Sequence, residues 1–213
     1  MRVLVTAGGT REPVDDVRVL TNSSTGRLGA YLADVFAAAG HDVLLLHGHG
    51  AVQPRAEMTR QLFGTAAELG ELLDQHVAGC DVVLHVAAVS DFIPERSPGK
   101  ISSGQDELVL VLHRAPKLID RLRQLAPQAL LVGFKLTSGR THDERLEISR
   151  QLLARARLDL VVSNDVTLVD EHDHEVILVG ESEAAGYGGG KSAVASAILR
   201  EVERLTTKGA TQG

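Results

Sequence analysis

The chain opens with MRVLVTAGGT (residues 1–10), where residues 3–6, Val-Leu-Val-Thr, form a mostly apolar and mostly β-branched run that leads toward two glycines. Such a run is typical of a strand buried on both faces of a parallel sheet. Residues 26–39 then carry an apolar stripe at helical spacing, Gly40 suits a helix C-terminus, and residues 42–46 are apolar again. This strand–helix–strand order predicts an α/β fold.

The same alternation continues along the chain. Further helices are expected at residues 65–77, 116–125, 143–156 and 191–205, and further strands at 81–86, 108–112, 130–134 and 158–162. Thr65 followed by Glu68 is a capping-box pattern. Residues 166–169 and 175–179 predict a hairpin. The expected fold is Rossmann-like: a mostly parallel sheet with helices on both faces and a C-terminal β-hairpin. Residues 1–205 would form one domain, and residues 206–213 a frayed polar tail.

The composition bounds the class of protein. The chain has 213 residues, and only 3% are aromatic, so Val, Leu and Ala must build the core. A net charge of −6 argues against a nucleic-acid partner. No apolar stretch approaches the roughly 20 residues that span a bilayer, so no membrane association is expected. The single cysteine, Cys80, favours a reducing cytoplasm, and a buried structural thiol is favoured over a nucleophile.

Three motifs come close to those of other enzymes. Glycines near residues 8 and 26 suggest a nicotinamide-dependent reductase, but about 15 residues separate them, too many for a short strand-to-helix turn. The second strand also leads to His47 instead of the acidic residue that holds a ribose. Tyr187 and Lys191 have the spacing of a reductase catalytic pair, but three intervening glycines oppose a helix. Residues 190–192 end like a P-loop, whose first glycine would fall on Ala185.

Two local signals remain open after these motifs are rejected. A glycine-rich turn that leads into a helix beginning at Lys191 suits a phosphate group, although a solvated lysine is an equal alternative. His172 and His174 lie among acidic residues and could suggest a metal, but a solvated turn is the favoured interpretation, so no metal ligand is assigned.

Four polar loops follow the expected parallel strands. They cover residues 8–26, 87–100, 133–137 and 163–166. Ligands bind at the carboxyl ends of the strands in sheets of this kind, so we expect the four loops to converge on one crevice. The first loop is long, and long loops in compact domains are usually functional.

At this point the chain closely resembles the phosphopantothenate–cysteine ligase family. Residues 8–26 match the family's Gly-Gly-Thr-x-Glu-Pro-Ile-Asp-x-Val-Arg-x-Ile-x-Asn-x-Ser-Ser-Gly signature, with Val14, Leu20 and Thr25 as substitutions. Residues 87–92, 133–136 and 164–165 match its later motifs. The resemblance spans nearly the whole chain and no flavin decarboxylase half is present, so it implies the stand-alone form of the ligase, without flavin.

The resemblance implies an acid–amino-acid ligase of coenzyme A biosynthesis. It would join 4′-phosphopantothenate to L-cysteine through an acyl-nucleotidylate, converting CTP or ATP with Mg²⁺ to a nucleoside monophosphate and pyrophosphate. Asn22 would hold the acyl phosphate intermediate, Lys100 would cover the α-phosphate, and both would be catalytic. Arg18 would bind the phosphate of phosphopantothenate across a homodimer interface, and Ala88 would also meet substrate.

The remaining roles implied by the resemblance concern the nucleotide. Its binding residues would be Gly8, Gly9, Ala87, Asp91, Lys100, Phe134 and Lys191. Asp91 would accept hydrogen bonds from the ribose hydroxyls, Phe134 would pack against the base, and Lys191 would meet the outer phosphates bridged by Mg²⁺. The family often has Lys-Ile-Lys-Lys where this chain has Lys100 followed by Ile101, Ser102 and Ser103, so two cationic side chains are missing.

Two alternatives are carried forward from the sequence. One is a nicotinamide-dependent, short-chain-reductase-like enzyme, and the other is a nucleotide-binding module without catalysis. The preference for CTP or ATP, the residues that bind cysteine and the ligands of Mg²⁺ are left open by the sequence.

Overall fold

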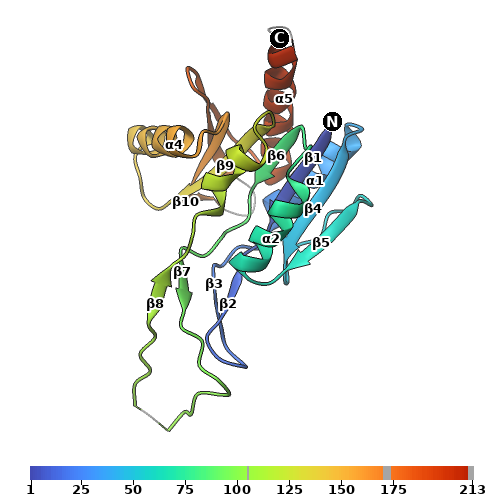
Figure 1. The fold of residues 1–213 in the computed structure, drawn as a ribbon. Helices are drawn as coiled ribbons and strands as arrows, with labels where there is room; N and C mark the ends of the chain where they lie inside the picture. The colour runs from blue at the N-terminus through green and yellow to red at the C-terminus, as the bar shows by residue number, and fades with distance from the viewer. Residues whose placement is uncertain (105, 170–173, 211–213) are drawn as a thin grey trace.

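The computed structural model describes residues 1–104, 106–169 and 174–210 (Figure 1). Its centre is an eight-stranded sheet in the order β12-β11-β10-β9-β6-β1-β4-β5. Neighbouring strands from β5 across to β10 are parallel, whereas β11 and β12 are antiparallel. The predicted, mostly parallel sheet is confirmed. The strands are β1 (Arg2–Ala7), β4 (Asp42–Gly48), β5 (Thr59–Phe63), β6 (Val82–His85), β9 (Leu130–Thr137), β10 (Leu160–Val169), β11 (His174–Val179) and β12 (Ala184–Tyr187).

Helices cover both faces of the sheet. One face carries α1 (Arg27–Ala38) and α5 (Lys191–Ala210); the other carries α2 (Ala66–His76), the 3-10 turn η1 (Leu118–Arg121), α3 (Leu122–Leu125) and α4 (His142–Ala156). Val3 and Val5 join the core under α1 and α5, and Leu4 joins the core under α2 and α4. The first strand is therefore buried on both sides, as expected. No helix in the described ranges is long and apolar enough to cross a membrane.

The strand order fixes where a ligand can bind. Counted along the chain, the six parallel strands lie in the order 3-2-1-4-5-6, which reverses between β1 and β6. At such a reversal the connecting segments leave toward opposite faces and open a crevice outside the carboxyl ends of the strands. The segments that follow β1 and β6 are the first two loops singled out in the sequence.

Local capping chemistry explains why α1 and α2 begin where they do. Thr65 accepts from the backbone N–H of Glu68, whose carboxylate accepts in turn from the N–H of Thr65, so the predicted capping box is confirmed. Gly26 caps α1 in the left-handed conformation, with φ of 70°. A Cβ there would lie 2.8 Å from the Cβ of Ala51 and 3.1 Å from the N of Gly8. Only glycine meets both demands.

Two hairpins extend from the sheet beyond the crevice and form what we call the arm, residues 11–21, 92–104 and 106–114 (Figure 1). The first pairs β2 (Arg11–Pro13) with β3 (Val19–Thr21), and the second pairs β7 (Phe92–Pro94) with β8 (Leu112–Arg114). The root of the arm is tied to the body. Arg11 N–H donates to Gly64 O at 2.8 Å, and the buried carboxylate of Glu12 accepts from the N–H of Ala66 at 2.9 Å.

Several expected boundaries were wrong. The strand expected at 108–112 is β8, which begins only at Leu112 and pairs with β7. The helix expected at 116–125 begins as the 3-10 turn η1, and only the four residues of α3 reach regular helical geometry. The last helix continues to Ala210, so the tail expected from residue 206 is helical through that point. Strands β2, β3, β5, β7 and β12 were not predicted.

Candidate functional site

A cavity of about 560 Å³ lies at the carboxyl ends of the parallel strands, at the reversal between β1 and β6. All four predicted loops contribute to it, which confirms their convergence. The predicted site residues Gly8, Asn22, Ala87, Ala88, Asp91, Phe134 and Lys191 lie in its wall. Also in the wall are residues that the site prediction did not include, namely Ser23, Ser24, Thr25, Gly26, Arg27, Leu28, Gly29, Val86, Leu136, Asn164, Val166 and His174.

The floor of the cavity is built by backbone pairing between the loops after β1 and β6. Gly9 and Ala88 form an isolated parallel bridge, in which the N–H of Ala88 donates to Gly8 O at 2.8 Å. The buried hydroxyls of Thr10 and Ser90 hydrogen-bond to each other at 2.9 Å. This bridge fixes the small residues Gly8 and Ala88 in the cavity wall, where a ligand can approach the main chain closely.

Asn22 is held above this floor by its own amide. Its Nδ2 donates to the carbonyl oxygen of Ala88 at 3.2 Å. A Cβ added at Gly9 would lie 2.8 Å from the backbone oxygen of Asn22, so the close passage of the two segments needs glycine. Asn22 and Ala88, both predicted to meet substrate, are therefore in direct contact. Gly9 supports them from beneath and is outside the cavity wall.

Two helix N-termini face the cavity. Ser23, Ser24 and Thr25 lead into α1, and Lys191 is the first residue of α5. Helix N-termini present unpaired N–H groups and positive dipole ends, which suit phosphate oxygens. The N-terminus of α1 is marked in the sequence by a hydroxyl-rich stretch before a glycine-capped helix. Sequence reasoning singled out only Asn22 in that stretch.

Asp91 and Phe134 lie on the side of the cavity toward β6 and β9. The exposed carboxylate of Asp91 forms an ion pair with Lys117, which the sequence did not single out. Phe134 is half-buried and packs against the core on the α1 side while it lines the cavity. The carboxylate of Asp91 thus already has a cationic neighbour at the cavity wall.

The Asn164–Asp165 pair has divided roles. Asn164 lines the cavity, whereas Asp165 is buried beneath it. The hydroxyl of Thr167, then that of Thr137 and the N–H of Arg140, hold the pKa of Asp165 far below its usual range, against the opposing effect of burial. Asp165 therefore stays anionic and orders the turn between β9 and α4.

Arg18 and Lys100 lie together in the arm, and neither is in the wall of the cavity of its own chain. The guanidinium of Arg18 forms an ion pair with Asp15 and donates to the carbonyl of Ile101, the residue after Lys100. The two cationic residues that sequence reasoning placed with Asn22 are thus close to each other but separate from it within one chain.

Burial shifts the pKa values of two further side chains, His85 and Cys80. His85 is buried, with its Nδ1 3.2 Å from the Thr6 hydroxyl, and burial lowers its pKa to about 4. Cys80 is half-buried, not fully buried as expected, and its thiol donates to His76 O at 3.2 Å. Burial raises the pKa of Cys80, so it lacks the thiolate character of a nucleophile.

The structure also bears on the weaker signals in the sequence, namely the reductase-like pair and the two histidines of the expected turn. Tyr187 ends β12 and Lys191 begins α5, so the two residues do not share a helix, as expected when the reductase-like pair was rejected. His174 is buried, so its interpretation as part of a solvated turn was wrong; His172 lies outside the described residues. Within the described ranges, no three His, Cys, Asp or Glu side chains gather as metal ligands.

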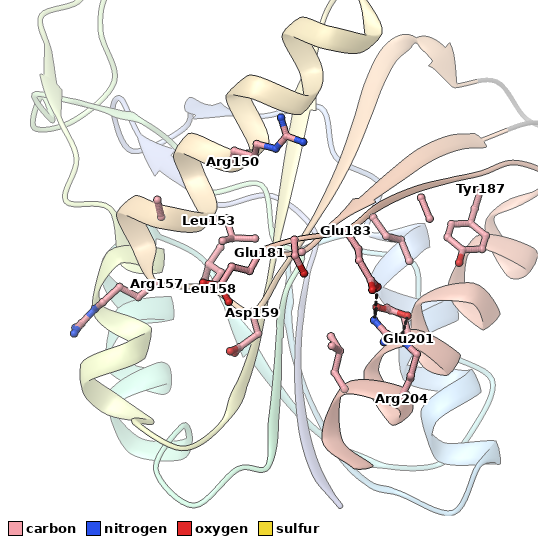
Figure 2. Close-up of a pocket in the computed structure, with 16 residues that line it drawn as sticks. Arg150, Leu153, Arg157, Leu158, Asp159, Glu181, Glu183, Tyr187, Glu201 and Arg204 are labelled. Atoms are coloured by element: carbon pink, nitrogen blue, oxygen red, sulfur yellow. Dashed lines mark hydrogen bonds and ion pairs between the residues drawn. The ribbon is translucent and has the colours of Figure 1, made fainter. Parts of the chain in front are cut away.

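A second, larger cavity of about 1010 Å³ lies at the opposite, amino end of the strands, between α4 and α5 (Figure 2). Its wall mixes charges of both signs, and Arg204 forms ion pairs there with Glu183 and Glu201. Parallel sheets bind ligands at the carboxyl ends of their strands, so the cavity beside Asn22 is favoured over this one as the candidate site.

Comparison with known proteins gives a consistent result. The family of the DNA/pantothenate metabolism flavoprotein C-terminal domain matches residues 1–205. The Coenzyme A biosynthesis bifunctional protein CoaBC of Thermococcus kodakarensis is 40% identical over 182 residues, which cover 84% of this chain and 45% of that protein. The chain thus spans somewhat under half the length of this curated relative.

Two solved structures share the fold. The DNA/pantothenate metabolism flavoprotein from Streptococcus pneumoniae superimposes with a TM-score of 0.91 at 28% identity, covering 96% of this chain and 99% of that one. The C-terminal domain of a CoaBC protein superimposes with a TM-score of 0.81 at 29% identity, covering 97% and 96% of the two chains.

Proposed function

The chain belongs to the family of the DNA/pantothenate metabolism flavoprotein C-terminal domain, and from this premise we propose that it ligates 4′-phosphopantothenate to L-cysteine. The observation that carries the proposal is the contact between Asn22 and Ala88 at a strand-order reversal, beside two helix N-termini suited to phosphates. The relative from Thermococcus kodakarensis carries a coenzyme A biosynthesis name, which supports the same pathway for this chain.

The reaction requires activation of a carboxylate, which is a poor electrophile. A carboxylate oxygen of phosphopantothenate attacks the α-phosphorus of CTP or ATP, and the bond to pyrophosphate breaks. The amine of cysteine then attacks the acyl carbon, loses a proton and displaces the nucleoside monophosphate. Both steps depend on holding the reacting groups together and on neutralising developing negative charge.

The residues of the cavity suit these demands. The amide of Asn22 can donate to a phosphate or acyl oxygen without adding charge to the site. The N-terminus of α1, with residues 23–25, and the N-terminus of α5, with Lys191, would receive the outer phosphates. Asp91 would accept from the ribose, Phe134 would pack against the base, and the backbone at Gly8 and Ala87 would permit close approach.

Mg²⁺ fits this arrangement as a partner of the nucleotide. It prefers oxygen ligands and usually keeps waters and substrate phosphates in its coordination shell. Asp91 is the only carboxylate that the described residues contribute to the cavity wall, and its proposed role is at the ribose, so phosphate oxygens and water would supply the ligands of the ion. When bound, the ion would neutralise phosphate charge. CTP and ATP are both retained as co-substrates, because base selectivity depends on contacts beyond those argued above.

A homodimer would bring Arg18 and Lys100 to a cavity. Both lie in the arm, outside the wall of their own chain's cavity. The arm also exposes an apolar run, with Val109 81% and Val111 55% exposed. Contiguous exposed apolar surface marks an interaction site, and a second copy of the chain is the occupant that we propose. Arg18 would bind the substrate phosphate from the partner, and Lys100 would cover the α-phosphate there.

The experiment that tests the function is a coupled pyrophosphate assay with 4′-phosphopantothenate, L-cysteine, Mg²⁺ and either CTP or ATP, with the product identified by mass. Pyrophosphate release that requires all the substrates, with formation of phosphopantothenoylcysteine, is expected. Oxidation of NAD(P)H without pyrophosphate would favour a reductase. Nucleotide binding without turnover would favour a binding module. Cytoplasmic location stays a prediction from Cys80.

A further inference from the structure

The carboxylate of Asp15 is completely buried in the arm, in the turn between β2 and β3. Its Oδ1 accepts from the backbone N–H groups of Val17 at 2.9 Å and Arg18 at 2.7 Å, which fixes the turn. Burial alone would raise the pKa of Asp15, but the N–H groups of Val17, Ile101 and Arg18, with the Arg18 guanidinium, lower it to about 2. Asp15 is therefore an anion at neutral pH.

The second oxygen of Asp15 reaches the other half of the arm. Its Oδ2 accepts from Nη1 of Arg18 at 2.5 Å and from the backbone N–H of Ile101 at 3.0 Å. Nη1 of Arg18 also donates to the carbonyl of Ile101 at 3.3 Å. On the other side of Lys100, the carbonyl of Gly99 accepts from the N–H of Asp16 at 3.1 Å. Lys100 is thus held between two tethered neighbours.

Arg18 has one edge occupied and one edge available. Only Nη1 of its guanidinium has hydrogen-bond partners within the described part of the chain, and its side chain is 39% exposed. Nε and Nη2 can therefore meet a phosphate, while the ion pair with Asp15 fixes the plane in which they point.

Building on the proposed ligase function, we propose that Asp15 is a positioning residue that sets the phosphate-binding edge of Arg18 and the Lys100 segment in a fixed relation. One buried carboxylate contacts both. The substrate phosphate and the reacting carboxyl group lie at different places on the same molecule, so the cations that meet them must keep a constant spacing. Loss of that spacing costs rate as well as affinity.

The test compares Asp15→Asn with Asp16→Asn, which removes a charge from the next residue at an exposed ion pair with Arg96. In Asp15→Asn, KM for 4′-phosphopantothenate is expected to rise about tenfold or more and kcat to fall, because an amide cannot neutralise the guanidinium. KM for cysteine should not change. Asp16→Asn should match the wild type. In an Arg18→Ala background, Asp15→Asn should add little to KM for 4′-phosphopantothenate.

A second readout does not depend on activity. Trypsin should cleave the folded Asp15→Asn protein after Lys100 faster than the wild type, with cleavage after Arg155 in α4 unchanged. If Asp15→Asn does not fold, Asp15→Glu, which keeps the charge but displaces it by one methylene, replaces it with the same expected directions.

Unchanged KM and unchanged cleavage after Lys100 in the folded variant would overturn the inference. A wild-type protein that makes no phosphopantothenoylcysteine would refute the ligase function on which the positioning role rests. The trypsin comparison would still report whether Asp15 holds the Lys100 segment, so the two failures are distinguishable.

Discussion

The side-chain amide of Asn22 donates a hydrogen bond to the carbonyl oxygen of Ala88, 66 residues further along the chain, at 3.2 Å. This bond joins the loop after β1 to the loop after β6 at the reversal of the strand order. It orients an amide that would otherwise rotate freely, so that the group is already placed before a substrate arrives.

Replacing Asn22 by Ala should therefore reduce kcat by about a hundredfold or more, the usual effect of losing one preorganised donor. The thermal midpoint should change little, because the residue is exposed and its bond lies at the surface of the cavity. Gln128→Ala, which removes an exposed amide near the amino end of β9, is the matched control. Full turnover in Asn22→Ala, measured by pyrophosphate release, would refute the catalytic assignment.

Helix α1 approaches the sheet closely at Gly29. A Cβ there would lie 2.5 Å from the Cβ of Ala7 in β1, so Gly29→Ala forces α1 away from the sheet and should destabilise the protein by about 1–3 kcal/mol. Gly186→Ala is the control, because a Cβ in β12 meets nothing within 4 Å. Urea unfolding measures both variants. Equal stability of the two would contradict the close packing of α1 on β1.

His85 should make stability depend on pH. Burial lowers its pKa from 6.5 to about 4, so the unfolded chain binds a proton there that the folded protein excludes. Above pH 6.5 the histidine is neutral in both states and does not reduce the free energy of unfolding. As the pH falls from 6.5 toward 4, the free energy of unfolding decreases with a slope of up to about 1.4 kcal/mol per pH unit.

Chemical unfolding between pH 4 and 7.5 checks this effect of His85. His85→Asn, which can keep a polar group near Thr6, should flatten the profile in that window. His113→Asn changes an exposed histidine of the arm and should leave the slope as it is. An unchanged slope in His85→Asn would show that other groups cause the dependence.

The proposed homodimer makes the apolar run of the arm testable. Val109→Asp places a charge on a side chain that is 81% exposed, so it should not disturb the fold of one chain. In sedimentation the wild type should be a dimer and the variant a monomer with little ligase activity, because Arg18 and Lys100 would no longer reach a partner. Leu62→Asp, at a half-exposed residue of β5, should remain dimeric and active. A monomeric, active wild type would exclude action across an interface.

The body of the fold could be predicted because its signals are local. The apolar run at Val3–Val5 is buried, Thr65 forms its capping box with Glu68, and Gly40 adopts a φ of 81° after α1. The arm could not be predicted in the same way. Its strands are three residues long and its exposed positions carry apolar residues, as at Val109, so neither burial nor alternation marks them.

The sequence predicted which residues belong to the candidate site better than it predicted how those residues are arranged. Motif resemblance selected Asn22, Ala88, Asp91 and Phe134, which the structure brings into one cavity wall. It also selected Arg18 and Lys100, which lie elsewhere in the chain's own fold. Lys117 was missed because its ion pair with Asp91 joins residues 26 positions apart, and no local pattern marks that contact.

By itself the sequence determined the alternation of strands and helices, the burial of β1 and the position of the polar loops. Each of these depends on the chemistry of a few neighbouring residues. Only the tertiary structure decided that Asn22 meets Ala88, that His85 is buried, and that one carboxylate, Asp15, contacts both Arg18 and the Lys100 segment. These contacts join residues distant along the chain, and they exist only when the sheet order and the arm bring those residues together.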